Sequence, residues 1–258
     1  MSVITSQHIN KVLKISLNRP DKANSFNREM ALALQQELDK AAADKTVRAI
    51  LLTGSGKAFC AGQDLAEATN MDAATIEKFV REHYNPIVLK IRALEKPVVC
   101  AVNGVAAGAG ANIAFACDLV MASSTASFIQ SFSKIGLIPD SGGTFFLPRL
   151  VGLQKATAMT FLAEKISASE AVELGLIYKS IDENQLETES LALATKLSNM
   201  PTKGLALTKK LLNQSFNNTL NEQLNQEAFA QVEAGLTADS KEAINAFLEK
   251  REPNFKGE

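Results

Sequence analysis

Two glycine-containing loops carry backbone amides that could bind a negatively charged oxygen. One runs from Ala58 to Leu65 and the other from Asn103 to Gly110, and each is expected between a buried strand and a helix. Amides freed at such turns can converge on a developing oxyanion, helped by the partial positive end of a helix. Taken singly, each loop is also typical of a tight turn or of close helix packing. Neither fits the phosphate-binding pattern G-x-x-x-x-G-K-[ST] or a clean G-x-G-x-x-G nucleotide pattern.

Asp140 is a well-placed carboxylate for moving a proton. It follows Gly-Leu-Ile-Pro and precedes Ser-Gly-Gly-Thr and the apolar run 145–147. Because this pattern is also a good helix start, Asp140 could instead be a helix N-cap. Phe128, Ile129 and Phe132 precede it and could form either core or pocket. If they line a pocket, partial desolvation would raise the pKa of Asp140 toward a value suited to accepting and returning a proton.

The other reactive side chains have simpler interpretations. His83 lies in an expected helix with no partner at metal-ligand spacing, which favours a surface or pocket-wall role. Glu82 beside it is expected on a solvated face. Cys60, Cys100 and Cys117 form no C-x-x-C pair and have small or apolar neighbours, so we expect reduced, mostly buried thiols. We predict no metal site.

Alternating strands and helices are expected to position these groups. β-Branched or partly alternating runs that end in turn residues predict strands. Asn27 can cap a helix with an apolar face, residues 66–94 are helical in pattern, and a further helix is expected after Gly110. The pattern predicts an α/β core over residues 1–200 and a C-terminal helical segment over residues 201–258. The predicted strands cover residues 12–17, 47–53, 97–102 and 118–122, and the last three helices cover 205–212, 220–236 and 239–250.

Composition excludes several classes of partner. The chain has 258 residues, 46% of them hydrophobic, and a net charge of −1, so there is no global field to attract nucleic acid or an anionic membrane. Its N-terminus does not resemble a signal peptide, and no apolar run approaches the roughly 20 residues that span a bilayer. We therefore expect a cytoplasmic protein without nucleic-acid or membrane partners.

The two loops together closely resemble the crotonase superfamily of enoyl-CoA hydratases and isomerases. Residues 58–65 resemble its first oxyanion segment, 103–118 its second, 136–144 the segment that follows, and 246–255 its C-terminal signature. The resemblance implies a spiral of ββα units with C-terminal helices that mediate trimers, often paired into hexamers. It also implies an acyl-CoA substrate whose thioester enolate is held by the amides of Gln63 and Ala109. Coenzyme A would be part of the substrate, with no separate cofactor.

The resemblance also assigns roles to the carboxylate positions. Family hydratases use two glutamates, and the matching residues here are Asn112 and Phe132, neither of which can act as a base at neutral pH. Asp140 matches the essential aspartate of family dienoyl-CoA isomerases and of the ring-opening isomerase of phenylacetate breakdown, which the chain resembles most. An isomerase that shifts a double bond or opens a ring epoxide to an oxepin is therefore favoured. The alternatives are an enoyl-CoA hydratase and a non-catalytic assembly subunit.

Substrate contacts follow from the same resemblance. Residues 22–24 resemble the adenine-side contact, residues 61–65 the contact with pantetheine and nucleotide, and two C-terminal residues resemble groups that reach a neighbouring subunit's nucleotide. The segment from Glu67 to Asn85 resembles the variable wall of the acyl pocket. The expected substrate-binding residues are Lys22, Ala23, Asn24, Ala61, Asp64, Leu65, Tyr84, Asn112, Phe132, Phe247 and Lys250.

Overall fold

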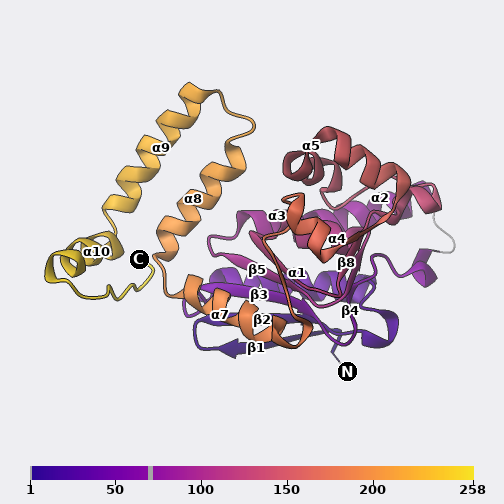
Figure 1. The fold of residues 1–258 in the computed structure, drawn as a ribbon, viewed down its shortest axis with the longest axis horizontal. Coiled ribbons are helices and arrows are strands. Elements are labelled where there is room, and N and C mark those ends of the chain that lie inside the picture. The colour runs from indigo at the N-terminus through magenta and orange to yellow at the C-terminus, as the bar shows by residue number, and fades with distance from the viewer. Residues whose placement is uncertain (1, 69–71) are drawn as a thin grey trace.

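Two sheets form the core of the fold, and three successive units of the chain contribute one strand to each (Figure 1). In this computed structural model, residues 2–68 and 72–258 are described. The larger sheet has the order β1-β2-β3-β5-β7-β10 and the smaller the order β4-β6-β8-β9. The larger sheet comprises β1 (Ile4–Ile9), β2 (Val12–Leu17), β3 (Ala49–Gly54), β5 (Val98–Val102), β7 (Leu119–Ser123) and β10 (Lys179–Ile181), and the smaller comprises β4 (Ala58–Cys60), β6 (Val105–Ala107), β8 (Ser127–Ile129) and β9 (Lys165–Ser167).

The strand pairs β3–β4, β5–β6 and β7–β8 each pass from the larger sheet to the smaller one, which winds the chain into a spiral. All ladders are parallel except β1–β2 and β8–β9. The expected α/β crotonase architecture is confirmed. The strands β4 and β6 lie within the two glycine-containing loops that the sequence indicated, residues 58–65 and 103–110, which are called the oxyanion loops below, so each of these loops contains a short strand.

Helices cover the sheets and link their strands. Before residue 200 the α-helices are α1 (Arg28–Ala43), α2 (Ala73–Lys78), α3 (Asn85–Ala93), α4 (Ala109–Ala116), α5 (Gly143–Leu162), α6 (Ala168–Glu173) and α7 (Leu186–Ser198). A π-helical turn at Phe79–Tyr84 joins α2 to α3, and 3₁₀ turns occur at Pro20–Lys22, Leu65–Ala68, Ser131–Ile135 and Glu183–Gln185. The Asn27 side chain accepts a hydrogen bond from the amide of Met30, so the predicted cap of α1 is confirmed. Helix α5 bends at Gly152, where φ is +73°.

The inner strands of the larger sheet are buried on both faces, and alternate side chains of each strand point to opposite faces. On β3, Ile50 and Leu52 join the main core, whereas Ala49 and Leu51 pack with the residues of α7. Strand β5 divides in the same way. This two-sided burial explains why the predicted strands read as continuous apolar runs.

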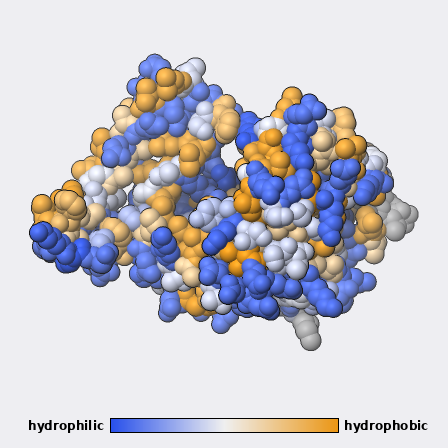
Figure 2. All heavy atoms as spheres, viewed as in Figure 1, coloured by the Kyte–Doolittle hydropathy of each residue, from blue (hydrophilic) through white to orange (hydrophobic). Residues whose placement is uncertain are grey.

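The C-terminal helices are α8 (Thr202–Gln214), α9 (Leu220–Gly235) and α10 (Ala238–Glu249), and they extend away from the sheets (Figure 1). Lys209 ties α8 to the core, because its ammonium donates to Asp118 Oδ2 at 2.8 Å and to the Ile91 carbonyl at 2.7 Å. Hydrophobic side chains remain on the surface of this helical projection (Figure 2). None of the helices within residues 2–68 and 72–258 combines the length and hydropathy needed to cross a bilayer.

Candidate active site

An apolar cavity of about 240 Å³ lies between the two oxyanion loops, the π-helical turn and the loop before α5. It brings together Gln63, Ala109 and Asp140, which the sequence separates by up to 77 positions. Among the described residues that line it, Asp140 is the one carboxylate. The lining residues are Ala61, Gly62, Gln63, Leu65, Ile76, Phe79, Val80, Tyr84, Gly108, Ala109, Ser131, Phe132, Lys134, Ile135, Leu137 and Asp140.

The amides of Gln63 and Ala109 are available to a ligand. Among the hydrogen bonds of residues 2–68 and 72–258, neither amide donates to a protein acceptor. The two loops touch here, since a Cβ placed on Gly62 would lie 3.7 Å from the amide nitrogen of Ala109. Ala109 is the first residue of α4, so its amide points out of the helix and adds to the partial positive charge of that end.

Glycines permit this close approach of backbone segments. Gly62 and Gly108 have φ values of +91° and +52°, in the region that L side chains rarely adopt. Gly110 lies against β4, and a Cβ there would come within 2.6 Å of the Cβ and carbonyl oxygen of Cys60. The glycines in both loops are therefore required by the geometry that presents the amides.

Asp140 lies on the pocket wall between the 3₁₀ turn at 131–135 and α5. Burial raises its pKa from 3.8 to about 6, although the Ser141 hydroxyl, which donates to Oδ1 at 2.8 Å, acts in the opposite direction. The N-cap interpretation is wrong, because α5 begins at Gly143 with Gly142 as its cap and no side chain caps it. The Asp140 carbonyl, rather than its carboxylate, accepts from the amide of Gly143 at 2.8 Å.

Asn112 and Phe132, the residues that match the hydratase glutamates, occupy different environments. Phe132 is buried and lines the cavity. Asn112 is fully buried outside the lining and donates to the Asp140 carbonyl at 2.9 Å, while Gln130 donates to its Oδ1 at 2.8 Å. Sequence reasoning did not identify Ser141 or Gln130, and only the position of Ser141 next to Asp140 could have suggested one of them.

Tyr84 connects the wall of the cavity to the first oxyanion loop. Its hydroxyl donates to Gln63 Oε1, and its ring packs edge-on against Phe26 at 5.8 Å. Burial raises the pKa of Tyr84 well above its ordinary value, and the negative charge of Asp140 adds to this, so the phenol stays protonated. Residues 69–71 of the expected wall segment Glu67–Asn85 lie outside the described residues.

His83 and Glu82 are neighbours on the π-helical turn but differ in burial. His83 is buried against Phe79, with ring centroids 4.9 Å apart, and does not line the cavity, so the expected surface or pocket-wall role is wrong. Burial lowers its pKa, which keeps the imidazole neutral. Glu82 is exposed as expected and lies 3.8 Å from Lys78 Nζ.

The three cysteines are free and buried, as expected. Cys60 ends β4 beside the first oxyanion loop, where its sulfur accepts a weak hydrogen bond from the amide of Gly62 at 3.4 Å. Burial raises the pKa of this thiol to about 12, so it is protonated at neutral pH and is a poor nucleophile.

Some of the residues expected to contact coenzyme A are exposed, and others are held in hydrogen bonds within the protein. Ala61 and Leu65 line the cavity and are exposed. Lys22 is also exposed, and the carbonyl of the next residue, Ala23, accepts a hydrogen bond from the Ala61 amide at 3.0 Å. Asn24 is fully buried and donates to the carbonyls of Ser55 and Ala58, both at 2.8 Å.

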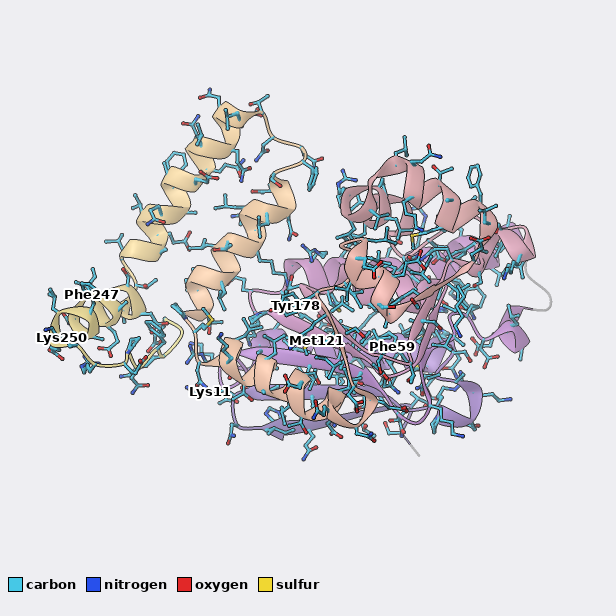
Figure 3. All side chains as sticks on the ribbon, in the orientation of Figure 1. Lys11, Phe59, Met121, Tyr178, Phe247 and Lys250 are labelled. Carbon is cyan, nitrogen blue, oxygen red and sulfur yellow. The ribbon has the colours of Figure 1, made fainter. Side chains whose placement is uncertain are left out.

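Asp64 pairs with Arg19 at 2.8 Å, and this hydrogen bond lowers the pKa of its carboxyl. Phe247 and Lys250 lie at the far end of the C-terminal projection, remote from Phe59 in the core (Figure 3). Neither residue belongs to the lining of the cavity in the same copy of the chain.

Comparisons with known proteins give matches over nearly the whole chain. The sequence model of the enoyl-CoA hydratase/isomerase family matches residues 7–258. The 1,2-epoxyphenylacetyl-CoA isomerase of Escherichia coli is 45% identical over 97% of this chain and 97% of its own length. The short-chain-enoyl-CoA hydratase of Clostridium acetobutylicum is 36% identical, covering 93% of this chain and 92% of its own.

Solved structures give the same result. The crystal structure of an enoyl-CoA hydratase from Bacillus anthracis is 32% identical and superposes with a TM-score of 0.93, covering 99% of this chain and 100% of that one. Since sequence and structure agree over nearly the whole length, this chain belongs to the enoyl-CoA hydratase/isomerase family of the crotonase superfamily.

Proposed function

We propose that this chain is an acyl-CoA isomerase, which shifts a carbon–carbon double bond in a CoA thioester or opens a ring epoxide to an oxepin. The observation that carries the proposal is the presence of one carboxylate, Asp140, among the described residues that line the cavity with the two free amides. A double-bond shift needs one base that removes a proton from one carbon and returns it to another. Asp140 can serve as that base alone.

The reaction of a 3-enoyl thioester would proceed in two proton transfers. Asp140 removes a proton from C2, and the electron pair moves into the thioester carbonyl, whose oxygen becomes negative. The amides of Gln63 and Ala109 donate to that oxygen. Asp140 then returns the proton to C4 as the double bond forms between C2 and C3, so the substrate and product have the same atoms. A pKa near 6 leaves the carboxylate ionised at neutral pH yet acidic enough to give the proton back.

Hydration would require a second group that positions water and moves its protons. At the two positions where family hydratases have glutamates, Asn112 is already bonded to Asp140 and Gln130, and Phe132 has no exchangeable proton. Water addition remains the alternative, because relatives such as the Clostridium acetobutylicum protein are hydratases by name.

Product analysis distinguishes these activities. The chain is incubated with 3-enoyl, 2-enoyl and ring-epoxide CoA thioesters, and the products are followed by mass and ultraviolet absorbance. Isomerisation leaves the mass unchanged and shifts the absorbance, whereas hydration adds the mass of one water. We expect Asp140→Asn to bind the thioester in calorimetry but to lose about two to four orders of magnitude in kcat. Full activity of this variant would refute the assignment, and absence of thioester binding to the wild-type chain would favour a non-catalytic assembly subunit.

A matched control is available on the adjacent wall segment. Glu82→Gln makes the same chemical change at an exposed carboxylate that does not line the cavity, and we expect it to retain wild-type activity. Loss of activity in both variants would point to a general charge effect.

We also propose that the chain acts as a homotrimer or a dimer of trimers. Helices α8 to α10 expose many large apolar side chains, which a neighbouring copy would cover. Phe247 would then approach the nucleotide of a substrate bound to the neighbouring copy, and the ammonium of Lys250 would suit its phosphates. The exposed apolar residues of this region are Leu212, Phe216, Leu220, Leu224, Phe229, Val232, Leu236, Ile244, Phe247 and Leu248.

A further inference from the structure

The loop that carries Asp140 belongs to no helix or strand. Residues 136–142 connect the 3₁₀ turn at 131–135 to α5. Without a regular ladder of hydrogen bonds, the position of the carboxylate depends on individual contacts. Two sets of side-chain contacts reach Asp140, one on the carboxylate and one on the main chain.

Ser141 makes the contact on the carboxylate. Its hydroxyl donates to Asp140 Oδ1 at 2.8 Å, and its side chain is 1% exposed. Its φ of +50° places a non-glycine residue in the left-handed region, a strained conformation that surrounding contacts must maintain. The other oxygen, Oδ2, receives no hydrogen bond from another residue in the part of the chain described. Ser141 therefore occupies one oxygen and leaves the other for a substrate proton.

Asn112 and Gln130 make the contact on the main chain. Asn112 Nδ2 donates to the Asp140 carbonyl at 2.9 Å, and Gln130 Nε2 donates to Asn112 Oδ1 at 2.8 Å. Both side chains are at most 1% exposed. Gln130 Oε1 is buried without a partner among the described residues, and burying such an atom costs free energy. This cost favours a specific role for the other end of the amide, Nε2, in holding Asn112. These two hydrogen bonds, from Gln130 to Asn112 and from Asn112 to Asp140, are called the relay below, and they orient Asn112 so that its amide group faces Asp140.

We propose that Ser141, Asn112 and Gln130 are positioning residues for Asp140. The Ser141 hydroxyl fixes one carboxylate oxygen, and the Gln130–Asn112 pair fixes the main chain that carries it. The inference rests on the proposed role of Asp140 as the proton-transferring base. Separate groups would then set the position of this base and its protonation.

The two sets of contacts should affect different measurements. The Ser141 hydroxyl stabilises the ionised carboxylate, so its removal raises the pKa of Asp140. The relay contacts only a carbonyl, so its loss misplaces the base without a comparable change in pKa. The other titratable groups among the described residues that line the cavity are the protonated Tyr84 and Lys134, and none of these variants changes them.

The test compares Ser141→Gly and Gln130→Met with Ser127→Ala. Glycine removes the hydroxyl and accepts the positive φ, so folding is retained. Ser127 is a suitable control because it is 1% exposed and its hydroxyl has no hydrogen-bond partner among the described residues. We expect Ser141→Gly to lower kcat about tenfold or more with KM unchanged and to raise the acid-limb pKa of kcat/KM by about one pH unit. We expect Gln130→Met to lower kcat several-fold with that pKa unchanged.

Different results would contradict the role of Ser141 and the role of the Gln130–Asn112 pair. An unchanged acid-limb pKa in Ser141→Gly would overturn the role of Ser141, because mere loosening of the loop would lower kcat without moving it. A kcat for Gln130→Met equal to that of Ser127→Ala would overturn the relay. If Asp140→Asn is inactive while all three variants match the wild type, the inference fails alone; if Asp140→Asn is fully active, the proposed function fails.

A direct titration avoids dependence on turnover. The ¹³C resonance of the Asp140 carboxyl is assigned by its absence in Asp140→Asn and followed with pH in the wild type and in Ser141→Gly. A higher midpoint in the variant supports the role of Ser141 even if the substrate is not among the thioesters tested. Identical midpoints would contradict it.

Discussion

Replacing Asp140 by asparagine should stabilise the protein, and by an amount that depends on pH. Burial raises the pKa of this carboxyl from 3.8 to about 6, so ionisation is less favourable in the folded chain than in the unfolded chain. Below pH 3.8 the group is protonated in both states and folding carries no penalty. As pH rises from 3.8 to 6 the unfolded chain ionises before the folded one, so stability falls, and above pH 6 the folded protein holds the charge and the full penalty applies. Asparagine has nearly the same shape, can accept the Ser141 hydrogen bond and carries no charge.

The magnitude follows from the size of the pKa change. A difference of about two pH units, at 1.36 kcal/mol per unit, corresponds to about 3 kcal/mol when the carboxylate is fully ionised. Proton linkage gives about 1.6 kcal/mol of this at pH 5 and about 3 kcal/mol at pH 8. The free energy of unfolding of Asp140→Asn relative to wild type should therefore increase by about 1.4 kcal/mol between these two pH values.

Urea denaturation at pH 5 and pH 8 measures this difference. The chain has no tryptophan, so circular dichroism is the suitable probe, and protein concentration is kept equal in case subunits associate. Glu82→Gln provides the control, because its carboxylate is exposed and should show little pH-dependent difference from wild type. A constant offset between Asp140→Asn and wild type across this range would refute the reasoning, since it would mean that Asp140 titrates alike in the folded and unfolded chain.

Two further substitutions test the packing of the oxyanion loops and the exposed helices. Gly110→Ala should destabilise the chain by about 1–3 kcal/mol and reduce activity, because the new Cβ would meet Cys60 at 2.6 Å and displace the start of α4; thermal unfolding and steady-state kinetics check this, and an unchanged Tm and kcat would contradict it. Phe229→Glu should lower the sedimentation coefficient by dissociating subunits, because this 78% exposed side chain on α9 would place a charge in the proposed interface; the same coefficient as wild type would contradict that placement.

The long elements of the fold could be predicted from sequence because they carry their own signals. The Asn27 cap and the apolar spacing after it identified α1, and the continuous apolar run identified β3. Strand β1 was missed because residues 5–8 are polar and exposed on an edge strand, which leaves no alternation to detect. Strands β4 and β6 were missed because each has three residues and is defined by pairing with the other across 47 positions, as Ala58 pairs with Val105.

In the site, too, residues within sequence motifs could be predicted, whereas contacts between distant positions could not. Resemblance to the superfamily pointed to the residues that the cavity brings together, Gln63, Ala109 and Asp140. It also pointed to Asn24 as a ligand contact, which stays a prediction; the Asn24 side chain accepts from the Arg19 amide in its own loop and donates to the carbonyls of Ser55 and Ala58. The link from Gln130 to Asn112 could not be foreseen, because residues 18 positions apart meet only once the spiral has closed.

The two amides that face the cavity belong to the main chain, and this has a consequence for how the enzyme tolerates change. Exchange of the side chain at Gln63 or Ala109 leaves the N–H group in place, provided that the glycines beside them are kept. The proposed oxyanion-binding role of these amides therefore does not depend on which side chain stands at those positions. The proposed base at position 140 acts through its side chain, so one substitution there would change the reaction while both amides stay in place.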